Sequence, residues 1–167
     1  MKKHLSTFLL VLVFLLGACI LLYPTVSDYW NSLHQTRVIG AYEDTLANMT
    51  QKDYSEYFAQ ADAYNAALAS LPAPLTGYEV LDTLEEVPKY RDVLDVNGTG
   101  IMGYIDIDKI GVELPIYHGT DPSVLNVAVG HLEGTSLPVG GVGTHCVLSA
   151  HRGLPSARLF TDLDRLK

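Results

Sequence analysis

Histidine and cysteine side chains in the second half of the chain are the residues best suited to chemistry near neutral pH. They are His118, His131, His145, Cys146 and His151. An imidazole has a pKa of about 6.5 and can both accept and release a proton. A thiol becomes a good nucleophile only where a base or a cation favours the thiolate. The set therefore raises two hypotheses, a metal site and a cysteine–histidine pair.

The spacing of these residues does not favour a metal site. The sequence contains no His-x-x-x-His pair and no Cys-x-x-Cys pair, which are common ligand spacings in zinc proteins. We therefore expect no metal and no cofactor, and we expect the histidines in this region to be mainly hydrogen-bonded structural residues.

A catalytic pair of Cys146 and His151 is not favoured either. The alternation in residues 144–151 predicts one strand, on which these two residues are an odd number of positions apart. Their side chains would then point to opposite faces and could meet only across a bulge. We expect Cys146 to be a buried core thiol.

The N-terminal residues 1–26 predict a transmembrane anchor. The stretch from Leu5 to Val26 is uncharged and has about the 20 residues that a helix needs to cross a bilayer. Basic residues precede it and acidic residues follow from Asp28 onward, which places the N-terminus inside the cell. We predict a single-pass protein of the cell membrane whose remaining chain is extracytoplasmic.

Two other interpretations of the N-terminus stay open. A cleaved signal peptide would have a shorter apolar core and a small-residue cleavage site. A lipoprotein signal would place a lipid on Cys19, but the apolar run continues through residues 20–22, where a lipidated cysteine would normally be followed by a polar tether. A thiol buried in lipid is the simpler interpretation.

Length and charge limit the remaining possibilities. With 167 residues, the chain can hold one domain and an anchor. Its 19 acidic and 11 basic residues give a net charge of -8, whereas a nucleic-acid partner would require a basic face. We therefore expect a membrane but no nucleic acid among its partners.

The anchor is followed by a helical segment and then by a loop. Apolar residues recur at helical spacing in residues 27–70, which predicts two amphipathic helices with a break in residues 48–53. Asp53 and Glu56 have the form of a capping box at the start of the second helix, and Pro72 and Pro74 would end it. Residues 71–100 show no sustained period, which predicts a lid-like loop.

The fold class predicted for the chain is mainly β, with the strands in residues 101–167. Alternating apolar residues in 101–107 and 110–116 predict a hairpin joined at Asp108-Lys109. Thr120-Asp121-Pro122 predicts the start of a short helix with a stop at Gly130. A glycine-rich turn, the strand 144–151 and a last short helix, with the apolar positions Leu159, Leu163 and Leu166, would follow.

Several segments of this region resemble the class C sortases, which are pilin-polymerising cysteine transpeptidases. The segments are 100–105 (GIMGYI), 114–120 (LPIYHGT), 129–138 (VGHLEGTSLP), 148–155 (LSAHRGLP) and 159–163 (LFTDL). The resemblance implies an eight-stranded β-barrel that cleaves a Leu-Pro-x-Thr-Gly sorting signal between Thr and Gly. A cysteine forms a thioester with the threonine, and a lysine amine of another pilin subunit resolves it.

The resemblance also assigns one catalytic residue. The family's histidine falls on His151, whereas its cysteine and arginine belong to segments further along and cannot be reassigned to Cys146 or Arg152. We therefore expect an incomplete sortase-type barrel, its first half in residues 101–167, preceded by a transmembrane helix and two amphipathic helices, and inactive by itself. The expected partners are pilin subunits with such sorting signals.

The lid departs from the family pattern. Class C sortases usually carry an Asp-Pro-aromatic plug, but the one Asp-Pro pair here is Asp121-Pro122, and only Tyr78 could serve as a plug in the loop. The alternative function is a non-enzymatic, membrane-tethered interaction protein, in which the helices after the anchor bind a partner and the β region is a scaffold.

Overall fold

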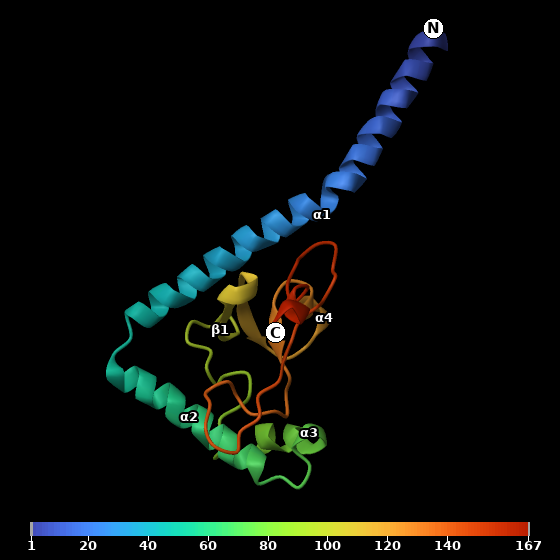
Figure 1. Ribbon diagram of the computed structural model, residues 1–167. Coiled ribbons are helices and arrows are strands. Elements are labelled where there is room, and N and C mark those ends of the chain that lie inside the picture. Colours follow the sequence, from blue (N-terminus) through green and yellow to red (C-terminus); the bar gives the residue numbers. More distant parts are fainter. Residues whose placement is uncertain (1, 167) are drawn as a thin grey trace.

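The computed structural model describes residues 2–166 (Figure 1). Met1 and Lys167, the ends of the predicted anchor and of the predicted barrel region, lie outside the described residues. Helix α1 (Lys2–Ala47) and helix α2 (Gln51–Ala69) come first, and a small sheet with long connecting segments follows.

Helix α1 is one continuous helix of 46 residues. It joins the predicted anchor to the first predicted amphipathic helix, so the expectation of two separate helices after the anchor is wrong. Pro24 lies inside it, and an internal proline removes one backbone hydrogen bond and commonly kinks a helix without ending it. Figure 1 shows α1 bending between its dark blue and lighter blue parts.

The N-terminal part of α1 has the properties of a membrane span. Among the described residues it is the one helix that is long and apolar enough, with a mean hydropathy of 2.8 in its best 18-residue window, of which none is buried. A signal sequence near the N-terminus passes the same test, so the anchor and its orientation stay predictions.

The break between the helices lies where the sequence predicts it, but its cap differs. Thr50 is the N-cap of α2, and its hydroxyl accepts a hydrogen bond from the Asp53 amide at 3.3 Å. The Asp53 carboxylate accepts hydrogen bonds from the Thr50 amide at 2.7 Å and from the Thr50 hydroxyl at 2.8 Å, and these two bonds lower the pKa of that carboxyl. Asp53 is therefore the third residue of the capping box, with Thr50 and not Glu56 as its partner.

Residues 71–100 are packed, although they show no periodicity. A short helix α3 (Pro74–Gly77) and a 3-10 helix (Tyr78–Thr83) are followed by turns. Leu81, Tyr90 and Val93 are almost fully buried. The second half of this segment is therefore part of the hydrophobic core and not a loose lid.

The predicted hairpin is present. Strands β1 (Ile101–Ile107) and β2 (Val112–His118) pair antiparallel, with Ile105 opposite Leu114. A 3-10 turn (Asp108–Ile110) and Gly111, at a φ of 60°, connect them. A positive φ of this kind is where glycine is favoured.

Two short strands complete a sheet of order β1-β2-β3-β4. Helix α4 (Pro122–Leu125) leads to β3 (Val129–His131), which pairs parallel with β2, and β4 (Leu148–Ser149) pairs antiparallel with β3. Gly130, the predicted helix stop, lies inside β3, because α4 ends one turn after it begins.

The prediction of a mainly β chain is wrong. Helices α1 and α2 contain 46 and 19 residues, whereas the four strands contain 7, 7, 3 and 2. Only Leu148–Ser149 of the predicted strand 144–151 is a strand, since β3 offers it just two partner residues. The last predicted helix is a 3-10 turn (Leu163–Arg165).

Candidate active site

His151 lies just beyond the end of β4, where Ala150 and then the imidazole-bearing residue leave the sheet. Its side chain is half-buried, and its carbonyl accepts a hydrogen bond from the Phe160 amide at 3.1 Å. Within residues 2–166 no side chain or backbone group hydrogen-bonds the ring. Both ring nitrogens therefore remain available to a substrate, as a general acid–base requires.

The segment from His151 to Phe160 forms a closed loop. Besides the bond between its two ends, the Gly153 amide donates to the Thr161 hydroxyl at 3.1 Å. Gly153 has a φ of 76°, and glycine adopts this turn without the steric cost that other residues meet. His151 thus lies at the neck of the loop, which is the point where hydrogen bonds join its two ends. We call residues 151–160 the His151 loop.

Cys146 precedes β4 and is a free, half-buried thiol. The predicted geometry, opposite faces of one continuous strand, is wrong because the strand does not extend to either residue. Burial raises the pKa of the Cys146 thiol, which disfavours the thiolate that a nucleophile needs. The prediction of a buried core thiol is correct only in part, because the Cys146 side chain is half-buried.

His131 is a structural residue in the centre of the fold. It is fully buried, and burial lowers its pKa. Its Nε2 lies 2.9 Å from the Ser136 carbonyl and its Nδ1 lies 2.9 Å from the Tyr90 hydroxyl. A carbonyl only accepts, so the neutral ring carries its proton on Nε2 and accepts from Tyr90 at Nδ1.

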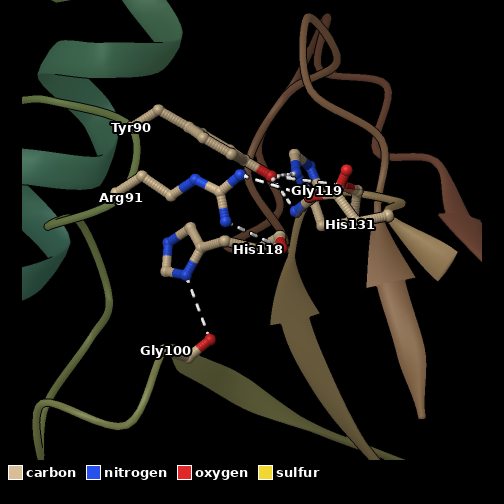
Figure 2. A network of polar contacts seen from close by, with 7 residues as sticks. Tyr90, Arg91, Gly100, His118, Gly119 and His131 are labelled. Carbon is tan, nitrogen blue, oxygen red and sulfur yellow. Dashed lines mark hydrogen bonds and ion pairs between the residues drawn. The ribbon is translucent and has the colours of Figure 1, made fainter. Parts of the chain in front are cut away.

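Figure 2 shows how His131 belongs to a wider buried network. The Tyr90 hydroxyl also accepts from the Gly119 amide at 2.9 Å. The buried ring of His118 contacts the Gly100 carbonyl at 3.1 Å and the Val93 carbonyl at 2.8 Å. These contacts join residues 90–100 to the ends of β2 and β3.

Two further residues, Arg91 and Gly130, contribute to this network. The Arg91 guanidinium donates to the His118 carbonyl at 3.4 Å, and it lies 3.7 Å from the exposed carboxylate of Asp121. Gly130 lets two backbone segments approach closely, because a Cβ atom there would lie 2.3 Å from the Gly119 carbonyl oxygen. The network therefore holds the segment around Arg91 and the ends of β2 and β3 together.

The other polar residues considered from the sequence are exposed. His145 points to solvent while its backbone pairs with Ser136, and Arg152 forms an exposed ion pair with Asp164 at 2.9 Å. Tyr78, the candidate plug, is half-buried against the core. In the part of the chain that the structure describes, no three His, Cys, Asp or Glu side chains are grouped so that they could hold a metal ion.

Sequence reasoning missed Tyr90 and Arg91. They lie in the stretch without periodicity, so neither hydrophobic spacing nor a motif distinguishes them from loop residues. A signal that could have found them is the mixture of large apolar and charged residues in residues 87–94, which follows no regular period but is unusual for a solvated loop.

Comparison with known proteins identifies the fold. Residues 105–167 match the sortase domain family. Sortase C1 from Streptococcus agalactiae is 46% identical with a TM-score of 0.67 over 78% of this chain and 65% of that one. Sortase C-1 from Streptococcus pneumoniae is 35% identical with a TM-score of 0.62 over 78% of this chain and 66% of that one. No curated protein sequence matches the chain.

The extent of the match matters for function. The chain spans slightly less than two thirds of the length of these solved structures. The similarity thus extends over most of the residues described above, including the sheet and the segment that contains His151, and over part of each relative.

Proposed function

Because the chain belongs to the sortase family, we propose that it contributes the N-terminal part of a class C transpeptidase that joins pilin subunits. The observation that carries this proposal is the 46% identity to a sortase C1 over 78% of the chain. A solved structure of Streptococcus pneumoniae sortase C has been related to pilin substrate specificity, which supports a pilin as the substrate class.

In the proposed reaction, His151 is the general acid–base. A cysteine thiolate attacks the threonine carbonyl of a Leu-Pro-x-Thr-Gly signal, the Thr–Gly bond breaks, and the imidazolium gives its proton to the leaving glycine amine. A lysine amine of a second pilin then attacks the thioester, the thiolate leaves, and the neutral imidazole takes the amine's proton. The unoccupied ring nitrogens of His151 support this role.

We propose that neither of the two cysteines of this chain is the nucleophile. Cys19 lies in the apolar run, and burial raises the pKa of Cys146. We therefore propose that residues 1–167 by themselves do not catalyse transpeptidation. A Leu-Pro-x-Thr-Gly peptide and an amine acceptor should give no product with this chain, and turnover that Cys146→Ala abolishes would refute the assignment of Cys146.

The activity can be tested in a chimera. Residues 1–167 are joined to the C-terminal third of Streptococcus agalactiae sortase C1, and peptide transfer to an amine is measured. We expect transfer that a thiol reagent blocks. A folded chimera without transfer would favour the alternative, a membrane-tethered interaction protein whose β region is a scaffold.

The proposed location is the cell membrane, with the sheet outside the cell. The support is the unburied apolar part of α1 and the change of charge after it. Protease added to intact cells should remove the residues after Tyr23, and full protection of Tyr42 would refute this topology.

The proposed lid is restricted to residues 71–86. Leu75, Val80 and Leu84 are exposed there, whereas Tyr90 and Val93 are buried beyond it. Deleting residues 74–80, which spares the buried Leu81, should speed hydrolysis of a sorting peptide by the chimera if this segment covers the site.

A further inference from the structure

We propose that helix α1 positions His151, by holding the tip of the His151 loop with Asp28 and Asn31. This inference rests on the proposed general acid–base role of His151. Asp28 and Asn31 would be positioning residues, since neither contacts the reacting atoms.

The contacts that carry the inference connect distant parts of the sequence. The Asp28 carboxylate accepts a hydrogen bond from the Arg158 amide at 2.7 Å. The Asn31 side-chain amide donates to the Ser156 carbonyl, also at 2.7 Å. Asp28 and Asn31 are three residues apart and so lie on one face of the helix. Two backbone groups of the loop are thus fixed to one helix face.

The shape of the loop links this tip to His151. Its neck is closed by the Phe160 amide on the His151 carbonyl and by the Gly153 amide on Thr161. Figure 1 shows the red C-terminal segment extending toward α1. A short loop fastened at both ends transmits a displacement of its tip to its neck, where the imidazole begins.

The loop also holds an unfavourable backbone conformation. Leu159 is buried and has a φ of 39°, which is uncommon for a residue other than glycine. Such conformations persist only where surrounding contacts determine them. Arg158, the preceding residue, is held by Asp28 through its amide and by Asp162 through its guanidinium. Loss of the Asp28 contact should therefore let the loop relax.

Packing holds the inner side of the loop, because Ala157, Leu159 and Phe160 belong to the hydrophobic core. The side that faces α1 is not filled: a groove of about 350 Å³ lies there, with Asp28 and Gly153 among its lining residues. Because this space is open, the loop can shift toward it when its polar contacts are removed.

The helix provides a matched control. The Gln35 side-chain amide donates to the Val127 carbonyl at 2.7 Å, so Gln35 also ties α1 to the rest of the fold. Val127 precedes β3 and lies outside the His151 loop. Gln35→Ala therefore removes a comparable hydrogen bond without touching the loop.

The first experiment measures amide hydrogen exchange in the whole chain in detergent micelles. Asp28→Ala should speed exchange of the Phe160 and Gly153 amides about 5- to 30-fold, the effect of losing one or two hydrogen bonds. Asp28→Asn, which keeps an acceptor oxygen, and Gln35→Ala should leave both amides unchanged. Equal exchange in Asp28→Ala and in the unmodified chain would overturn the inference.

The second experiment measures transfer in the chimera with Streptococcus agalactiae sortase C1. Asp28→Ala should lower kcat about 10- to 100-fold, the range for a misplaced catalytic group, with KM unchanged and with rescue by Asp28→Asn. Losses that parallel those of Gln35→Ala and follow the melting temperature would show a merely structural role and overturn the inference. Full activity of His151→Ala would refute the proposed function instead, while leaving the exchange result to stand or fall separately.

Discussion

His131 and His151 lie on neighbouring strands or just beyond them, yet their surroundings differ completely. The His131 ring is fully buried, and both of its nitrogens are occupied by Tyr90 and Ser136. The His151 ring is half-buried, and within the described residues it has no hydrogen-bond partner. The comparison shows that an open ring nitrogen, and not the residue type, distinguishes a candidate catalyst from a structural histidine.

The largest expected effect is that of replacing His151, the histidine of this pair whose ring has no hydrogen-bond partner within the described residues. In the chimera, His151→Ala should lower turnover by about two to four orders of magnitude, the usual range for a lost general acid–base, and should leave the circular dichroism spectrum unchanged. His145→Ala is the control, because that side chain is exposed. Comparable losses for both variants, each folded, would show that the assignment to a single histidine is wrong.

The next largest effect tests the close backbone contact at Gly130, next to the buried His131. Gly130→Ala would place a Cβ atom 2.3 Å from the Gly119 carbonyl oxygen, and backbone can yield only by moving β3. We expect a loss of unfolding free energy of about 3 kcal/mol, at the upper end of the range for overpacking, in urea denaturation. Gly103→Ala, with nothing near its added Cβ, is the control, and an equal loss there would contradict the steric argument.

A smaller effect tests the hydrogen bonds themselves. Tyr90→Phe keeps the ring but removes the acceptor of the Gly119 amide and the donor to His131. Leaving such buried groups unpaired should cost about 1–2 kcal/mol of stability, measured by thermal unfolding. Tyr29→Phe removes an exposed hydroxyl, and a loss as large in that variant would argue against the network.

The smallest effect is on the pH dependence of stability. Burial holds the pKa of His131 below its usual value, so below the unfolded pKa of about 6.5 the unfolded chain binds more protons than the folded one. Stability should therefore fall as the pH decreases from 7.5 toward 6. Burial raises the pKa of Glu133, so that residue contributes to the pH dependence with the opposite sign. A His131→Asn variant with the same slope would exclude His131 as the cause.

The sequence predicted the elements in which local pattern and final environment agree. Residues 103–107 of β1 alternate between half-buried and exposed as their residues alternate in type, and the helix break near Thr50 follows from capping chemistry. The class of protein also followed from the sequence, because contiguous segments around His118, His131 and His151 resemble one family.

The sequence-based predictions are wrong where tertiary contacts, and not the local sequence pattern, determine the structure. Residues 144–151 have strand periodicity, but only Leu148–Ser149 pair regularly with β3, and the residues before them hydrogen-bond to the turn that follows β3. Residues 71–100 look like a loop because Tyr90 and Val93 fit the core without a regular period. The open ring of His151 could not be read from spacing, since it depends on what lies around the strand end.

The continuity of α1 has a consequence for how reactants would reach the protein. If Leu5–Val26 spans the bilayer, Asp28 follows two residues later, and at 1.5 Å per residue the tip of the His151 loop is held within a few ångströms of the membrane surface. Reactants that are themselves tethered to that surface would meet the protein through diffusion in two dimensions. Encounter rates would then follow the number of molecules per unit area of membrane, and not their concentration in the surrounding solution.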